Sequence, residues 1–103
     1  MDNLTVSLVN QIFELEQKLN AKGVDFVNRN IDRIKHELSE AGVQYLDPTG
    51  EPYSDTRTDC TANIVGELGS KMKITRTIKP IIIWESDQGI ELVQKGTVIV
   101  EAE

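Results

Sequence analysis

The sequence predicts an α+β fold in which a long amphipathic helical segment precedes a small, mainly antiparallel β-domain. Three observations support this prediction. No proline occurs before Pro48, and apolar residues recur in that part at gaps of three and four, the spacing of one helix face. From Lys71 onward apolar and polar side chains alternate, as they do in strands. A segment with prolines and glycine separates the two patterns, so we expect a helical dimerisation segment (1–42), a hinge and loop (43–59) and a small β-domain (60–103).

The apolar stripe of the helical segment runs from Leu4 to Ala41. Between Leu19 and Val27 it takes two successive steps of four residues, and Gly23 occupies the middle position. Such a step is compatible with a stutter in one long helix and with a junction between two helices. A glycine inside a helix costs about 1 kcal/mol relative to alanine, which makes a break at this position plausible. One long helix and a helical hairpin therefore both stay open.

The length of the apolar stripe predicts self-association. The part of the chain that follows is too small to cover all of it, and a stripe of this kind is typical of helices that pair with a second copy. We therefore expect a homodimer held together by a helical bundle. Packing of the stripe on the chain's own C-terminal half is the alternative. The expected dimer interface consists of Leu8, Ile12, Leu15, Leu19, Val27, Ile31, Ile34 and Leu38.

The segment LDPTGEPY, residues 46–53, is expected to redirect the chain after the helix ends. Gly42 lies where a helix C-terminal cap is expected. Pro48 and Pro52 each disfavour the helical conformation in the residue before them. Gly50 is free to adopt a positive φ. We therefore predict a stiff hinge whose role is structural and which couples the two halves rigidly.

The β-domain is predicted from the alternation over Lys71–Trp84. Pro80 interrupts this run, so the strand is expected either at a sheet edge or broken there. From Ile81 to Ile83 the alternation becomes a continuous apolar run, which predicts burial on both faces. The core-facing side is expected to hold Met72, Ile74, Ile78, Ile82 and Trp84. The opposite side is expected to hold Lys71, Lys73, Thr75, Thr77 and Lys79. Further strands are expected at 61–65, 90–94 and 97–100, with a turn at 86–89.

Composition narrows the range of partners. The formal net charge of −6 argues against nucleic acid and anionic membranes, because both attract basic surfaces. No apolar run reaches the length of a membrane span, and the N-terminus lacks the pattern of a secretory signal. Cys60 is the only cysteine and has no internal disulfide partner, which fits a reducing cytoplasm. We expect it to be a small buried residue at a strand edge.

Few residues are suited to catalysis or to metal binding. His36 is the single histidine, lies off the apolar stripe and is expected at the surface. No second histidine or further cysteine is present to complete a zinc site. Asp55 and Asp59 lack the glycine and glutamate of a calcium loop, and no glycine-rich phosphate loop occurs. We therefore expect a protein that is not an enzyme and that needs no cofactor and no metal.

Four short stretches resemble the GrpE family, the nucleotide exchange factors of DnaK-type chaperones. The most specific is Leu46–Tyr53, which is similar to the family's sequence between the helices and the β-domain. Ala41-Gly42-Val43 resembles the helix end that precedes it, and Gly23-Val24 resembles the start of the family's last helix. Ile90–Gly96, IELVQKG, is similar to the family's Gln-Lys-Gly strand.

The resemblance implies a co-chaperone that promotes nucleotide release by binding the ATPase domain of a DnaK-type chaperone. The β-domain would lean on one lobe of that domain and open the nucleotide cleft, without making or breaking a bond. The alternative is a non-catalytic dimeric module whose helical stalk and β-head bind an unrelated protein partner. For the lysines among the candidate partner-binding residues, the alternative to partner binding is a strand face that is simply exposed to solvent. The candidate partner-binding residues are Arg57, Thr58, Lys71, Lys73 and Lys79.

Overall fold

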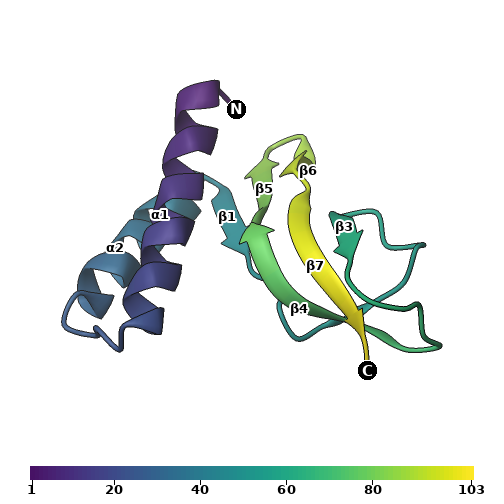
Figure 1. The fold of residues 1–103 in the computed structure, drawn as a ribbon. Coiled ribbons are helices and arrows are strands. Elements are labelled where there is room, and N and C mark those ends of the chain that lie inside the picture. Colours follow the sequence, from purple (N-terminus) through teal and green to yellow (C-terminus); the bar gives the residue numbers. More distant parts are fainter.

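The computed structural model describes all 103 residues, which form two helices followed by seven strands (Figure 1). The helices are α1 (Asn3–Ala21) and α2 (Asn28–Glu40). The strands are β1 (Val43–Leu46), β2 (Pro52–Tyr53), β3 (Cys60–Ile64), β4 (Met72–Lys79), β5 (Ile81–Ser86), β6 (Gly89–Gln94) and β7 (Gly96–Ala102). The predicted α+β class and the mainly antiparallel β-region are confirmed.

The helical segment is a hairpin of two helices rather than one long helix. The Asp2 side chain caps α1, because its Oδ1 accepts a hydrogen bond from the backbone N–H of Thr5 at 2.7 Å. At the other end Gly23 has a φ of 67°, and the N–H of Val24 donates to the carbonyl of Leu19 at 2.9 Å. This is the glycine-dependent helix ending in which the chain leaves through a left-handed residue. Gly23 therefore ends α1.

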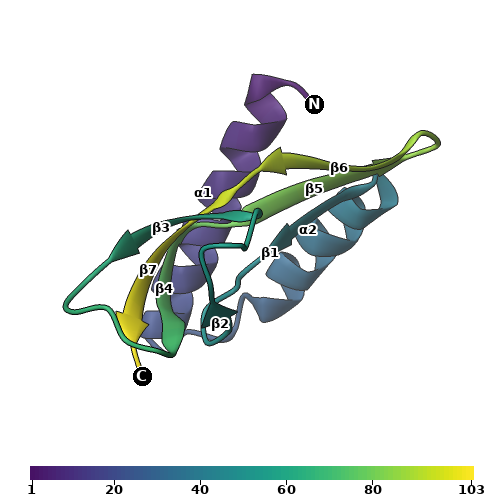
Figure 2. The ribbon, with the colours of Figure 1, turned by 90° about the vertical axis from the view of Figure 1, so that its right-hand side faces the viewer.

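The β-region is built on one long, bent hairpin (Figure 2). β4 and β5 follow each other with only Pro80 between them, and β6 and β7 follow each other with Lys95 between them. β5 pairs antiparallel with β6, and β4 pairs antiparallel with β7. The bend divides the ladder into a three-stranded sheet, β1-β5-β6, and a four-stranded sheet, β2-β4-β7-β3. Of the two alternatives predicted at Pro80, an edge strand and a broken strand, the structure has the broken strand. A proline has no N–H to continue the ladder.

The segment predicted as a hinge supplies two strands to this hairpin. β1 pairs with β5, and β2 pairs with β4. The loop between them is bonded to β4: Gly50 N–H donates to the carbonyl of Ile74 at 2.8 Å, and Ile74 N–H donates to the carbonyl of Glu51 at 3.0 Å. The first part of the segment 43–59 thus belongs to the two sheets. On the far edge β3 pairs with β7, the one parallel pair.

Two hydrophobic clusters lie on opposite faces of the bent sheet. Ile82 belongs to the cluster under the helices, with Val9 and Val43. Ile81 belongs to a second cluster, whose other buried members are Cys60, Ile74, Val98 and Val100. Neighbouring residues of a strand point to opposite faces, so both faces are covered at this point, as predicted for the run 81–83. The segment 54–59 joins strands at opposite edges of the four-stranded sheet and crosses the second cluster (Figure 2).

The predicted inward and outward sides of the Lys71–Trp84 run are wrong in the second half of β4. Ile78, expected in the core, is exposed, whereas Thr77, expected outside, is buried. The register against β7 shifts between Ile74 and Arg76 and again between Thr77 and Lys79. Each irregularity inserts a residue and moves the following side chains to the other face. Alternation alone does not reveal such a shift.

The residues of the predicted dimer interface differ in their exposure in the helical hairpin. Leu8 and Leu15 are exposed, and Ile31 is buried inside the chain. Half-buried positions are occupied by Ile12, Leu19, Val27, Ile34 and Leu38. The residues that bury α1 against the sheet are Val9 and Phe13, which the stripe did not include.

The turn from α2 into β1 brings two backbones into close contact. Gly42 has a φ of 84°, and its carbonyl accepts a hydrogen bond from the N–H of Glu85 at 2.7 Å. A Cβ at this position would overlap the carbonyl oxygen of Glu85. The predicted helix-ending role of Gly42 is confirmed, and the glycine also allows the turn after α2 to lie directly against the backbone of β5.

Candidate functional site

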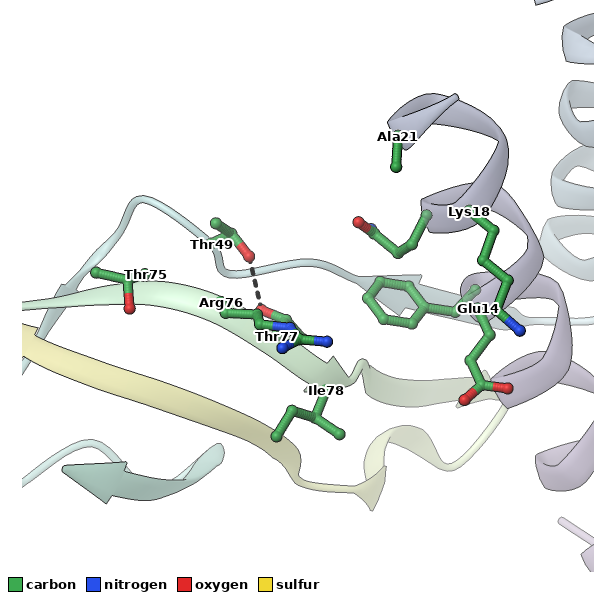
Figure 3. Close-up of a pocket in the computed structure, with 10 residues that line it drawn as sticks. Glu14, Lys18, Ala21, Thr49, Thr75, Arg76, Thr77 and Ile78 are labelled. Atoms are coloured by element: carbon green, nitrogen blue, oxygen red, sulfur yellow. Dashed lines mark hydrogen bonds between the residues drawn. The ribbon is translucent and has the colours of Figure 1, made fainter. Parts of the chain in front are cut away.

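A groove of about 450 Å³ separates the C-terminal half of α1 from β4 (Figure 3). Arg76 extends from β4 toward α1, and Glu14 and Lys18 lie across from it on the helix. Neither Arg76 nor Lys18 takes part in an ion pair. The lining residues are Phe13, Glu14, Gln17, Lys18 and Ala21 from α1, Thr49 from the loop after β1, and Thr75, Arg76, Thr77 and Ile78 from β4.

A polar network at one end of the groove ties the helix to the sheet. Gln17 Nε2 donates to Asp47 Oδ2 at 3.0 Å, which joins α1 to the loop. Both the N–H and the hydroxyl of Thr49 donate to Asp47 Oδ1, at 3.0 and 2.7 Å. The Thr49 and Thr77 hydroxyls are 2.9 Å apart, which joins the loop to β4 (Figure 3). Asp47 is therefore the centre of the contact between the helical hairpin and β4.

The ionised form of Asp47 is favoured by this network. Partial burial raises the pKa of its carboxyl group, but hydrogen bonds from Thr49, Thr77 and Gln17 outweigh burial and lower the pKa below its usual value. A carboxyl group with a lowered pKa in the folded state contributes stability that is present above its unfolded pKa, near 4. That contribution is lost as the pH falls through the folded-state pKa.

We expect Asp47→Asn to lower the free energy of unfolding by about 1 kcal/mol at pH 7, because charge-assisted hydrogen bonds are replaced by weaker ones. The difference from the unmodified protein should shrink as the pH falls below about 4, because Asp47 of the unfolded chain then takes up a proton and the folded protein does so only at its lower pKa. Urea unfolding at pH 7 and pH 3 measures both values. Asp55→Asn, at an exposed loop aspartate, is the matched control. A difference that is the same at both pH values would contradict the role given to the Asp47 charge.

The chemistry available in the groove is that of a polar binding surface. Two cationic side chains, three threonines and Gln17 line it around the edge of the Phe13 ring. No histidine or cysteine lines it, and no group of three or more His, Cys, Asp or Glu in the chain lies close enough together to hold a metal ion. His36 is on the exposed side of α2, 3.7 Å from Glu40. Cys60 is buried at the start of β3, as predicted, and burial together with the neighbouring Asp59 raises the pKa of its thiol.

The predicted partner-binding residues do not form one cluster. Lys71, Lys73 and Lys79 are all exposed, but they lie at different ends of β4. Lys79 follows Lys73 by six positions along the strand, or about 20 Å at the usual rise. Lys73 lies opposite Glu101 on β7, and Lys79 lies opposite Thr97.

Arg57, predicted as a partner contact, is occupied by interactions within the chain. Its Nε donates to Asp59 Oδ1 at 2.6 Å, and its Nη2 donates to Glu51 Oε1 at 2.9 Å. Its Nη1 donates to the Pro52 carbonyl at 3.3 Å, and its side chain is only 19% exposed. The hydrogen bond to Asp59 raises the pKa of Arg57 and lowers that of Asp59. Arg57 thus fixes the loop that crosses the second cluster, and the adjacent Thr58 is exposed on that loop.

Two groove residues were missed by the sequence analysis. Arg76 lies in the predicted strand between Thr75 and Thr77, and Lys18 lies on the predicted helix; neither was among the candidate site residues. The sequence did signal a basic β4, because Lys71, Lys73, Arg76 and Lys79 fall within nine residues. The two register shifts decide which of these side chains turns toward α1, and the sequence does not show them.

Neither helix is long and apolar enough to cross a membrane. No protein-family model, no curated protein and no solved structure was found to match the chain.

Proposed function

We propose that the protein is a homodimeric, GrpE-like co-chaperone that promotes nucleotide release from a DnaK-type chaperone by binding its ATPase domain. One observation carries the proposal: the segment that resembles the GrpE family, Leu46–Tyr53, lies at the joint between the helical hairpin and the bent sheet. Asp47 in this segment is bonded to Gln17 of α1, and Gly50 and Glu51 are bonded to β4. The segment therefore connects the helical hairpin to β4, which supports the proposed arrangement of a stalk and a head.

The exposed leucines of α1 support pairing with a second copy. Leu4, Leu8 and Leu15 lie within about 40° of one another around the helix, at 3.6 residues per turn. Val9 and Phe13, which pack on the sheet, lie roughly 140° away. The leucine face of α1 is thus directed away from the sheet, and nothing in the chain covers it. Two such hairpins joined by these faces would form a four-helix arrangement.

The mechanism works by differential affinity. The β-head has to bind the open ATPase domain more tightly than the closed one, because equal affinity for both shifts no equilibrium. A rigid joint supports this action, since a head that swivels freely on its stalk adapts to both states. Lys71, Lys73 and Lys79 are the candidate contacts on the head, with Thr58 on the crossing loop. Arg57 holds that loop in position.

We expect the protein to accelerate the release of a labelled nucleotide from a preloaded DnaK-type chaperone of the same organism. Lys71→Glu combined with Lys73→Glu should slow association by at least about tenfold at low ionic strength, because exposed charges act mainly on the association rate. Lys22→Glu, at the exposed turn between the helices, is the control. A dimer that leaves the release rate unchanged at saturating concentration would contradict the exchange function and favour the alternative, a dimeric module for an unrelated partner.

A further inference from the structure

The outer edge of β6 is open. β6 pairs with β5 on one side and with no strand on the other, whereas the outer edge of β7 is covered by β3. In an antiparallel pair, alternate residues direct their backbone N–H and C=O groups away from the partner strand. The open edge ends at Gln94, whose side chain forms two hydrogen bonds with Asn10 of α1, at 2.9 and 3.0 Å. Every second residue of β6 before Gln94 therefore presents unpaired backbone groups at this edge.

Apolar side chains accompany this open edge. Ile90 is 71% exposed and Leu92 is 42% exposed. They are two residues apart and hence lie on the same face of the strand. The tip of the hairpin lies at the end of the sheet away from the C-terminus (Figure 2). A hollow of about 420 Å³ lies at this tip, beside Trp84. Natural edge strands are normally protected by lysines, prolines or bulges. β6 has neither lysine nor proline, and its one bulge against β5, at Val93, lies beyond Ile90 and Leu92.

The charged side chains of the hairpin formed by β5 and β6 are all acidic. The segment 80–94 contains Glu85, Asp87 and Glu91 and no lysine or arginine. Glu85 lies opposite Ile90 in the ladder, and Glu91 is within β6 itself. All three carboxylates are exposed. A ligand strand that carries positive side chains would be attracted to this edge, and one that carries negative side chains would be repelled.

We propose that the open edge of β6 is a docking site for an extended, basic and apolar segment of a partner protein, which adds to the sheet as a further strand. The backbone groups of β6 would supply the affinity, and Ile90 and Leu92 would contact the apolar side chains of the segment. A second copy of this chain is disfavoured as the occupant, because pairing two β6 edges brings acidic side chains together. Nucleic acid is disfavoured for the same reason. The site goes beyond the proposed exchange function and requires neither a dimer nor a nucleotide.

The test uses the full-length protein and three labelled octapeptides with blocked ends. The first alternates valine with lysine, and the second alternates valine with glutamate. The third is the valine–lysine peptide with its two central valines replaced by proline, which removes backbone donors and prevents strand pairing. Fluorescence anisotropy measures binding, and hydrogen exchange identifies the amides that become protected. We expect only the first peptide to bind, with protection of β6 amides and no protection of the other outermost strands, β1, β2 and β3.

Glu85→Lys combined with Glu91→Lys should weaken binding of the valine–lysine peptide by at least about tenfold and give binding to the valine–glutamate peptide. Glu67→Lys combined with Glu103→Lys, at exposed acids elsewhere, should leave both affinities unchanged. Equal binding of the proline-containing peptide, protection located outside β6, or no binding of the valine–lysine peptide at millimolar concentration would each overturn the proposal. None of these outcomes bears on nucleotide release, so the two proposals fail or succeed separately.

Discussion

Phe13→Ala is expected to lower the free energy of unfolding by about 3–5 kcal/mol, the usual cost of removing a fully buried phenylalanine ring. Phe13 is 2% exposed and meets the Tyr45 ring edge-on, with ring centroids 6.3 Å apart. The Tyr45 hydroxyl donates to Glu16 Oε1 at 3.2 Å, and Lys35 of α2 binds the same carboxylate at 2.6 Å. Phe13 therefore supports the point at which both helices meet β1. A loss of this size is a large part of the stability of a small domain.

The chain contains its own control for this prediction. Phe26 lies in the turn between the helices and is 84% exposed. We expect Phe26→Ala to change the free energy of unfolding by less than about 0.5 kcal/mol, as exposed substitutions usually do. Urea unfolding followed by circular dichroism measures the free energy of unfolding of each variant, and the spectra before unfolding should show equal helix content. If both variants lose little stability, the helical hairpin does not depend on its packing against the sheet.

The sequence predicts the elements of this fold better than the faces that they bury. The helical spacing from Leu4 onward and the position of Gly23 are local signals, and both correspond to features of the structure. Neighbouring residues in the sequence do not decide which of the two apolar faces of α1 is buried. Leu8 and Leu15 satisfy the helical period as well as Val9 and Phe13 do, and only the position of the sheet decides which pair is buried. Hairpin formation at Gly23 sets that position.

The strands illustrate the same limit. Pro80 signals a break because a missing N–H is a property of the residue itself. The two register shifts in β4 depend on how β7 and the loop around Gly50 align with it, and these partners are far away in the sequence. As a result Thr77 is buried next to Thr49, whereas Ile78 faces the groove.

The candidate site was predictable in its chemistry but not in its arrangement. A basic β4 was visible in the sequence, and its lysines are exposed as expected. Arg57 lies within six residues of both its partners, Glu51 and Asp59, but the sequence does not show that the loop brings these three side chains together. The bond between Gln17 and Asp47 likewise joins residues that are thirty positions apart.

The dimer interface is tested by placing charge on the exposed face of α1. Leu8→Asp combined with Leu15→Asp puts two carboxylates per chain into the proposed interface, at a cost of several kcal/mol per dimer when they are buried without partners. Both leucines are exposed in the single chain, so the fold itself should persist. Leu68→Asp, at an exposed leucine in the loop before β4, is the matched control and should leave self-association unchanged.

The most direct test of the proposed function is the mass of the unmodified protein in solution, because the stalk that presents the β-heads exists only if the hairpins pair. Sedimentation equilibrium at tens of micromolar should give twice the chain mass of 11.5 kDa. The Leu8→Asp/Leu15→Asp variant should give the mass of one chain and keep its circular dichroism spectrum. A single-chain mass for the unmodified protein at this concentration would contradict the account.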